Sequence, residues 1–140
     1  MRRTVFVLAA CGALLAYLRD PVWLAGVTSG FSRWEQDGSG MRLRWMGGRA
    51  SFFVSAAARE LDIPVHAPAM DQSPGPFVID VRIDDRRVSR SVVQGPGWVV
   101  LTVPVPLAAN GRHVRRVDLY ASRTWGERSL SVQVGEVRAK

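Results

Sequence analysis

The sequence has little of the chemistry that metal sites and covalent cross-links need. Among its 140 residues there are one cysteine and two histidines. This excludes an intrachain disulfide and leaves too few soft ligands for a zinc site. No serine stands in a G-x-S-x-G context, and Gly38–Gly40 and Gly47-Gly48 match neither phosphate-loop pattern. We therefore predict no catalytic residues, no metal and no cofactor, and we expect that the protein is not an enzyme.

Lysine is nearly absent, so arginine carries most of the positive charge. Of the 19 basic residues 18 are arginine, and with 12 acidic residues the formal net charge is +7. The hydrophobic share of 47% and the charged share of 22% exclude both a polar disordered tail and a multi-span transporter. The length suits one folded domain. A basic chain often binds nucleic acid, but the exported location predicted below argues against that partner.

The first residues predict a membrane segment. Two arginines precede an uncharged stretch, Thr4–Leu18, and this order places the N-terminus in the cytoplasm and exports the remainder. A helix of that length reaches about 22 Å, less than a hydrocarbon core of about 30 Å. Snorkelling of a following arginine and an interfacial tryptophan would make up the difference. We predict a membrane anchor over residues 1–22, with Arg2, Arg3, Arg19 and Trp23 at the membrane interfaces.

Two other interpretations of this segment stay open. Leu8-Ala9-Ala10-Cys11 has the small residues that precede a lipidated cysteine, although the residues after Cys11 are apolar where a lipoprotein has a polar tether. A cleaved secretory signal is the third interpretation, but no small-x-small site follows the apolar core. With the anchor retained, the protein lies in a bacterial cytoplasmic (inner) membrane, and its C-terminal domain is periplasmic or otherwise extracytoplasmic.

Beyond Thr28 the pattern predicts strands. Short runs with period two recur about every ten residues between Gly, Pro, Asn and Asp, with no sustained helical period. We predict an all-β fold, an antiparallel β-sandwich or jelly roll of about eight strands behind one N-terminal transmembrane helix. Residues 23–40 would form a linker and entry segment, and residues 41–140 the sandwich.

Individual strands follow from this alternation. Phe77–Asp84 is the clearest, and Asp84-Asp85-Arg86 predicts a tight hairpin turn into Val88–Gln94. Trp98–Val105 is apolar on both faces, which predicts a central strand. Two further strands should be half-buried, one with Leu61, Ile63 and Val65 inside, and one with Val117, Leu119 and Ala121 inside and Asp118 facing water. A last strand should run through Leu130, Val132 and Val134, with a shift in the alternation at Gly135. We also expect a hairpin turn at Gly47-Gly48 between the strands Met41–Met46 and Arg49–Ser55.

Several segments together resemble a known domain. They are Thr28–Glu35, the Arg44–Phe53 run R-W-x-G-G-R-A-S-F-F, Gly97-Trp98, Arg115–Leu119, Ser122–Trp125 and Val132–Val137. The series resembles the extracytoplasmic β-sandwich domain that follows the membrane helices of some bacterial dolichyl-phosphate-mannose-type glycosyltransferases. Because the transferase chemistry belongs to the multi-helix part of those enzymes, the resemblance implies no catalytic residue here. It implies an accessory, carbohydrate-binding-like domain.

Aromatic and arginine side chains are the candidate contact residues. Indole rings can stack on sugar C–H faces, and guanidinium groups match phosphate geometry. Trp45 and Trp98 lie in strand-like runs, so we expect them in the core. The interleaving of arginines with acidic residues predicts cross-strand ion pairs on solvated faces. Contact with a partner or glycan is predicted for Trp34, Trp125, Arg33, Arg115 and Arg123.

The function predicted first is that of a non-enzymatic accessory subunit that docks through its sandwich onto a larger integral membrane protein complex. The alternative is a module that binds a carbohydrate or a lipid-linked sugar. The Asp84-Asp85 pair could ligate calcium, but turn formation explains the pair without a metal. The expected partners are therefore the membrane complex, membrane lipid around the N-terminal helix, and a glycan, with no nucleic acid.

Overall fold

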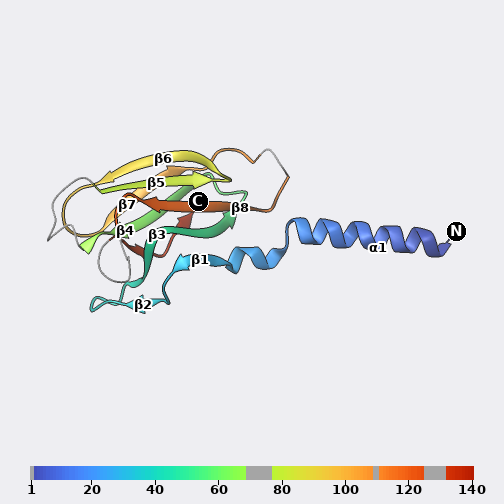
Figure 1. The fold of residues 1–140 in the computed structure, drawn as a ribbon, viewed down its shortest axis with the longest axis horizontal. Helices are drawn as coiled ribbons and strands as arrows, with labels where there is room; N and C mark the ends of the chain where they lie inside the picture. The colour runs from blue at the N-terminus through green and yellow to red at the C-terminus, as the bar shows by residue number, and fades with distance from the viewer. Residues whose placement is uncertain (1, 69–76, 109–110, 125–131) are drawn as a thin grey trace.

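The protein consists of one long N-terminal helix followed by a β domain (Figure 1). The computed structural model describes residues 2–68, 77–108, 111–124 and 132–140. Helix α1 (Arg2–Arg19) projects away from the strands, and its side chains from residue 4 to residue 19 are exposed. By length and composition Thr4–Gly26 could cross a membrane, and a signal sequence would have the same properties. An apolar helix that packs against nothing is not a core helix.

The β domain is antiparallel throughout the described part of the chain. After a short 3-10 helix, η1 (Val22–Gly26), ten strands follow, and they confirm the predicted all-β fold behind one N-terminal helix. Their bounds are β1 (Thr28–Phe31), β2 (Glu35–Gln36), β3 (Arg42–Ser55), β4 (Glu60–His66), β5 (Phe77–Ile83), β6 (Arg86–Val93), β7 (Val99–Pro104), β8 (Val114–Ala121), β9 (Val132–Gly135) and β10 (Arg138–Ala139).

The strands form a sheet that bends round nearly into a barrel. Its path is β10-β4-β9-β3-β8-β5-β6, with β7 paired to β4 and both β1 and β2 paired to β3. The last strand of this path, β6, contacts β7, so the two ends of the sheet approach each other. Strand β3 belongs to both halves, because its first part pairs with β9 and its second part with β8.

The core follows the predicted alternation. In β4 and β5 every second side chain is fully buried, namely Leu61, Ile63 and Val65 in one strand and Phe77, Ile79, Val81 and Ile83 in the other. The β5–β6 hairpin turns at Asp84 and Asp85, whose φ angles are 47° and 68°. Two positive φ angles at the centre of a two-residue loop match the twist of a hairpin, which confirms this predicted turn.

Gly47-Gly48 does not form the predicted turn. Both glycines lie inside the continuous strand β3, and neither has a positive φ angle. They separate the segment that pairs with β9, Leu43–Met46, from the segment that pairs with β8, Arg49–Ser55. The two expected strands are thus one strand that changes partner where side chains are absent. A positive φ is found instead at Gly30, where a Cβ would lie 2.2 Å from the Arg49 carbonyl oxygen.

The prediction of a central strand over Trp98–Val105 is also wrong. Strand β7 is at an edge and pairs with β4 alone within the described residues. Its inward residues Leu101 and Val103 are buried, but Val100 on the other side is 56% exposed. Trp45 and Trp98 are half-buried and lie outside the buried core cluster. The residues on the outer face of β7 are apolar although they are not buried in the core. That face lines a groove.

Residues 23–40 lie against the domain. Within them η1, β1 and β2 follow one another, and both strands pair with β3. Just before this segment, the Asp20 carboxylate accepts a hydrogen bond from the His113 backbone N–H and contacts His113 Nδ1 at 2.9 Å. Arg112 Nη2 donates to the Arg19 carbonyl at 3.3 Å. Side chains of the β domain therefore hold the C-terminal end of α1.

Candidate functional site

The outer surface of β4, β7 and β10 is hollowed into a groove of about 510 Å³. Strand β4 presents Asp62 and Pro64 on this side, because Leu61, Ile63 and Val65 point into the core. The β2–β3 connection and the β9–β10 connection close the groove. Its lining residues are Gly40, Met41, Arg42, Asp62, Pro64, Trp98, Val100, Gly135, Glu136 and Arg138. We call this hollow the Trp98 groove.

The floor of the Trp98 groove is apolar. Trp98 and Val100 come from the edge strand and its approach, and Pro64 from the neighbouring strand. At Gly135 a Cβ would lie 3.1 Å from Pro64 Cβ and 3.7 Å from Trp98 Cζ3. The missing side chain therefore lets both rings lie close to the sheet. The His66 ring lies 5.5 Å from the Trp98 ring between centroids and is tilted by 41° to it, and the Trp98 side chain is half-buried.

Charged groups lie around this apolar floor. Arg42 Nη1 donates to Glu136 Oε1 at 2.9 Å, and both side chains are more than half exposed. Asp62 pairs with Lys140 and accepts a hydrogen bond of 3.0 Å from Thr102 Oγ1. The hydrogen bond from Lys140, helped by that from Thr102, holds the pKa of Asp62 below its ordinary value. An apolar floor with a few convergent polar groups is the usual composition of a ligand site.

A second hollow of about 370 Å³ lies next to the first. Glu136 lines both hollows, and Trp34 and Arg44 line the second one. The Arg44 guanidinium lies 3.6 Å from the Phe31 ring centroid and 4.6 Å from that of Trp34. Arg42 lies over the Trp34 ring at 4.9 Å. We call this the Arg44 hollow, and the Arg42–Glu136 pair stands between it and the Trp98 groove.

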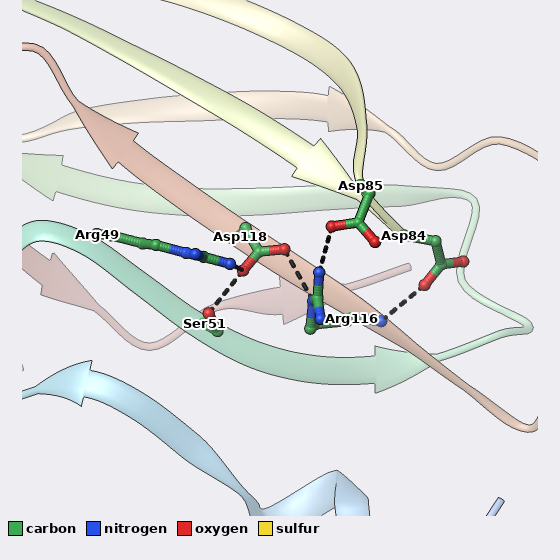
Figure 2. Close-up of polar contacts among 6 residues, drawn as sticks. All are labelled: Arg49, Ser51, Asp84, Asp85, Arg116 and Asp118. Carbon is green, nitrogen blue, oxygen red and sulfur yellow. Dashed lines mark hydrogen bonds and ion pairs between the residues drawn. The ribbon is translucent and has the colours of Figure 1, made fainter. Parts of the chain in front are cut away.

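A different polar cluster lies on β8, on the half of the sheet formed with β3 and β5 (Figure 2). Asp118 is fully buried and accepts hydrogen bonds from Arg49 Nη2 at 3.0 Å, Ser51 Oγ at 2.7 Å and Arg116 Nε at 2.9 Å. Burial raises the pKa of Asp118, but these three donors outweigh it and hold that pKa below its ordinary value. Figure 2 also shows Arg116 reaching Asp85, and its backbone N–H reaching Asp84.

This cluster is saturated, so it ties strands together rather than binding a ligand. It joins β3, β8 and the β5–β6 turn through side chains that already have partners. The Asp84-Asp85 carboxylates pair with Arg115 and Arg116, which agrees with the turn interpretation. The predicted cross-strand ion pairs are present, but the expectation that Asp118 faces water is wrong. Arg49 and Arg116 lie over it and exclude solvent.

The predicted contact residues fall in different places. Trp34 is 41% exposed and lines the Arg44 hollow, and Arg33 beside it is exposed. Arg115 is buried, and its Nε donates to Asp84 Oδ2 at 2.8 Å. Arg123 is exposed on the segment after β8. Trp125 lies outside the described residues.

The predicted interface residues lie along α1 and η1. Arg2 and Arg3 belong to the first turn of α1, Arg19 ends it, and Trp23 in η1 is 58% exposed.

The sequence interpretation missed most of the groove. Trp98 was assigned to the core, and Asp62 and Glu136 were seen only as members of ion pairs. The sequence indicates that guanidinium groups could bind phosphate, but it does not show where Arg42 and Arg44 lie in the fold. One signal was present, since an edge strand that is apolar on its outer face has an exposed apolar surface to explain.

No protein-family model matches the sequence, and no curated protein sequence matches it. Among solved structures, the chain is similar to a family two carbohydrate esterase from Clostridium thermocellum in complex with cellohexaose, with a TM-score of 0.53 and 12% identity over 81% of this chain. The match spans 31% of that protein, so it concerns about a third of the esterase. At this identity the similarity shows the fold alone.

A carbohydrate-binding module, CBM36, in complex with calcium and xylotriose is a more distant neighbour. Its TM-score is 0.45 and its identity 10%, over 78% of this chain and 89% of the module. None of the matches described here is a dolichyl-phosphate-mannose-type glycosyltransferase, so that resemblance stays a prediction.

Proposed function

We propose that the β domain is a non-catalytic module that binds a carbohydrate along the Trp98 groove. One observation carries the proposal: a half-buried indole beside His66 lines a hollow of about 510 Å³ that has charged side chains at its rim. A pyranose ring has an apolar C–H face that stacks on an indole and hydroxyl groups that hydrogen-bond to charged side chains. The groove offers both kinds of contact within one surface.

The positions of the polar groups support the same ligand class. Arg42 begins β3 and bonds to Glu136 on the β9–β10 connection, and Asp62 on β4 bonds to Thr102 on the adjacent strand β7. Each pair presents a donor and an acceptor, which is what sugar hydroxyls need, since a hydroxyl both donates and accepts. The carbohydrate esterase of similar fold has been seen with cellohexaose. Carbohydrate binding therefore replaces the accessory-subunit role as our main proposal, because no feature of the described surface specifically favours that role.

We further propose that α1 remains in a membrane and holds the domain on the outer side. The exposed apolar surface of α1 and the two arginines in its first turn support this orientation. A phosphatase fused behind Lys140 should be active and a cytosolic fluorescent reporter dark. Mature protein that lacks residues 1–26 and is free in solution would contradict the anchor without affecting the groove.

The groove is tested with the full chain in detergent micelles against a panel of neutral oligosaccharides, by calorimetry. We expect the wild type to bind one class, Trp98→Ala to weaken binding at least about 10-fold, and Trp98→Phe to stay within about 3-fold because a stacking face remains. Thermal melting separates binding from folding, since Trp98 is half-buried. Absence of glycan binding by the wild type, or unchanged binding by Trp98→Ala, would overturn the proposal.

A further inference from the structure

Arg44 is a buried cation without an acidic partner. Arg44 is 7% exposed, and its Nε is buried with no hydrogen-bond acceptor. No carboxylate of the described residues lies within ion-pair distance of it, whereas Arg49, Arg115 and Arg116 each meet an aspartate. Burying a charge is unfavourable unless it is paired and hydrogen-bonded. The environment of Arg44 is therefore incomplete in the protein alone.

The neighbours of Arg44 supply only part of what a guanidinium needs. Phe31 and Trp34 contact its charge through their rings, at 3.6 and 4.6 Å from the centroids. Such rings stabilise a cation electrostatically but accept no strong hydrogen bond in the plane of its N–H groups. Burial lowers the pKa of the Arg44 guanidinium, and no compensating group raises it. An acceptor in the hollow would complete the site.

The other charges around the Arg44 hollow leave room for an anion. Glu136 is the one acidic residue among the lining residues, and it is engaged by Arg42 at 2.9 Å. Arg42 itself lies over Trp34, and the exposed Arg33 adjoins Trp34 in the sequence. Glu35 is exposed on β2 and forms no ion pair among the described residues. The carboxylate that lines the hollow is thus already paired, while Arg44 lines the hollow without an acidic partner.

We propose that the Arg44 hollow binds an anionic group, a carboxylate or a phosphate, carried by the sugar ligand that lies along the Trp98 groove. A planar guanidinium binds the oxygens of either group through paired hydrogen bonds. The two hollows share Glu136, so a ligand of two or more sugar units reaches both. This inference rests on the proposed carbohydrate binding and narrows the ligand to acidic or phosphorylated sugars.

The first experiment observes the anion site without an oligosaccharide. The ¹⁵N-labelled full chain in micelles is titrated with glucuronate, with inorganic phosphate and with neutral methyl glucoside, following the Arg44 Nε–H and Trp34 indole signals. We expect shifts with at least one anion and none with methyl glucoside. Shifts with glucuronate alone identify a sugar acid, and shifts with phosphate alone a phosphorylated sugar. No shift with either anion, or equal shifts with methyl glucoside, would overturn the inference.

Arg82 provides the matched control. It also lies over an aromatic ring, that of Tyr120 at 4.8 Å, and its Nε is also buried without a partner, but it lines neither hollow. Arg44→Met should abolish the anion-induced shift of Trp34, and Arg82→Met should leave it unchanged. If Arg44→Met fails to fold, Arg44→Lys keeps the charge and should weaken anion binding about 5-fold or more. Unchanged binding in the folded Arg44 variant would overturn the inference.

The second experiment separates this inference from the proposed function. An acidic oligosaccharide and its neutral counterpart are compared by calorimetry on the wild type, Arg44→Met and Trp98→Ala. We expect Arg44→Met to remove an acidic preference of about 10-fold and to leave neutral binding intact. Neutral binding that depends on Trp98 but shows no acidic preference would overturn the Arg44 inference alone. Anion shifts at Arg44 without any oligosaccharide binding would overturn the carbohydrate function.

Discussion

The Asp118 cluster on β8 and the two hollows differ in how far their side chains already have partners. On β8 and its neighbours, Asp118 has three hydrogen-bond donors, and Arg115 and Arg116 also have aspartate partners. On the half formed by β4, β7 and β10, Trp98 and Val100 keep exposed apolar surface and the nearby Arg44 has no acidic partner. A saturated surface stabilises the fold, while an unsaturated one has interactions left for a ligand.

The largest loss of stability is expected in the Asp118 cluster. Asp118→Ala leaves Arg49, Arg116 and Ser51 without their shared acceptor, and breaking a buried ion pair lowers the free energy of unfolding by about 3 kcal/mol. Urea unfolding measures this loss. Asp62→Ala, whose ion pair with Lys140 is more exposed, should lose clearly less. Equal losses of unfolding free energy in the two variants would mean that the Asp118 cluster contributes no more to stability than the exposed Asp62 pair.

A smaller effect is expected from two valines on edge strands. Val100 and Val92 are 56% and 51% exposed, on β7 and β6 respectively, and only Val100 lines the Trp98 groove. Val100→Glu should weaken glycan binding about 10-fold, equivalent to about 1.4 kcal/mol, because a charged side chain would occupy the floor of the groove. Val92→Glu should bind glycan normally. Loss of binding in both variants would mean that the effect acts through the fold.

The smallest effect concerns pH. The pKa of Asp118 is held below its ordinary value, so its ionised form contributes stability above the ordinary aspartate range, and this contribution is lost as the pH falls through the lowered value. The difference in stability between the wild type and Asp118→Asn should therefore be constant near neutrality and shrink below about pH 4. Acid unfolding curves of the two proteins test this. A difference that grows on acidification would contradict the assignment.

Much of the fold could be predicted because alternation reports local burial. The β5–β6 hairpin, the inner face of β4 and the positions of most strands along the chain follow from residues that are close in sequence. The run Arg49–Ser55 was also recognised as a strand. Its continuity with Met41–Met46 was missed, because a glycine pair between two apolar runs fits a turn as well as a change of strand partner.

The candidate site could not be predicted in the same way, because it is formed by residues distant in sequence. Asp118 is buried by Arg49, which is 69 positions away, and alternation alone places an aspartate on the wet side. Arg44 is enclosed by Phe31 and Trp34, which requires β1 to pair with β3. Trp98 belongs to a run of residues that is apolar on both faces. Such a run fits a buried strand and the edge of a groove equally well.

The attachment of α1 has a consequence for how the domain searches for its ligand. One residue, Val27, separates η1 from β1, and Asp20 and Arg19 are bonded to His113 and Arg112. A flexible linker lets a module sample a volume, and the module's gain in local concentration depends on the length of that linker. The linker between α1 and this domain is very short. With α1 in a bilayer, as proposed, both hollows would stay at one height and one orientation, and a sugar chain would have to come to them.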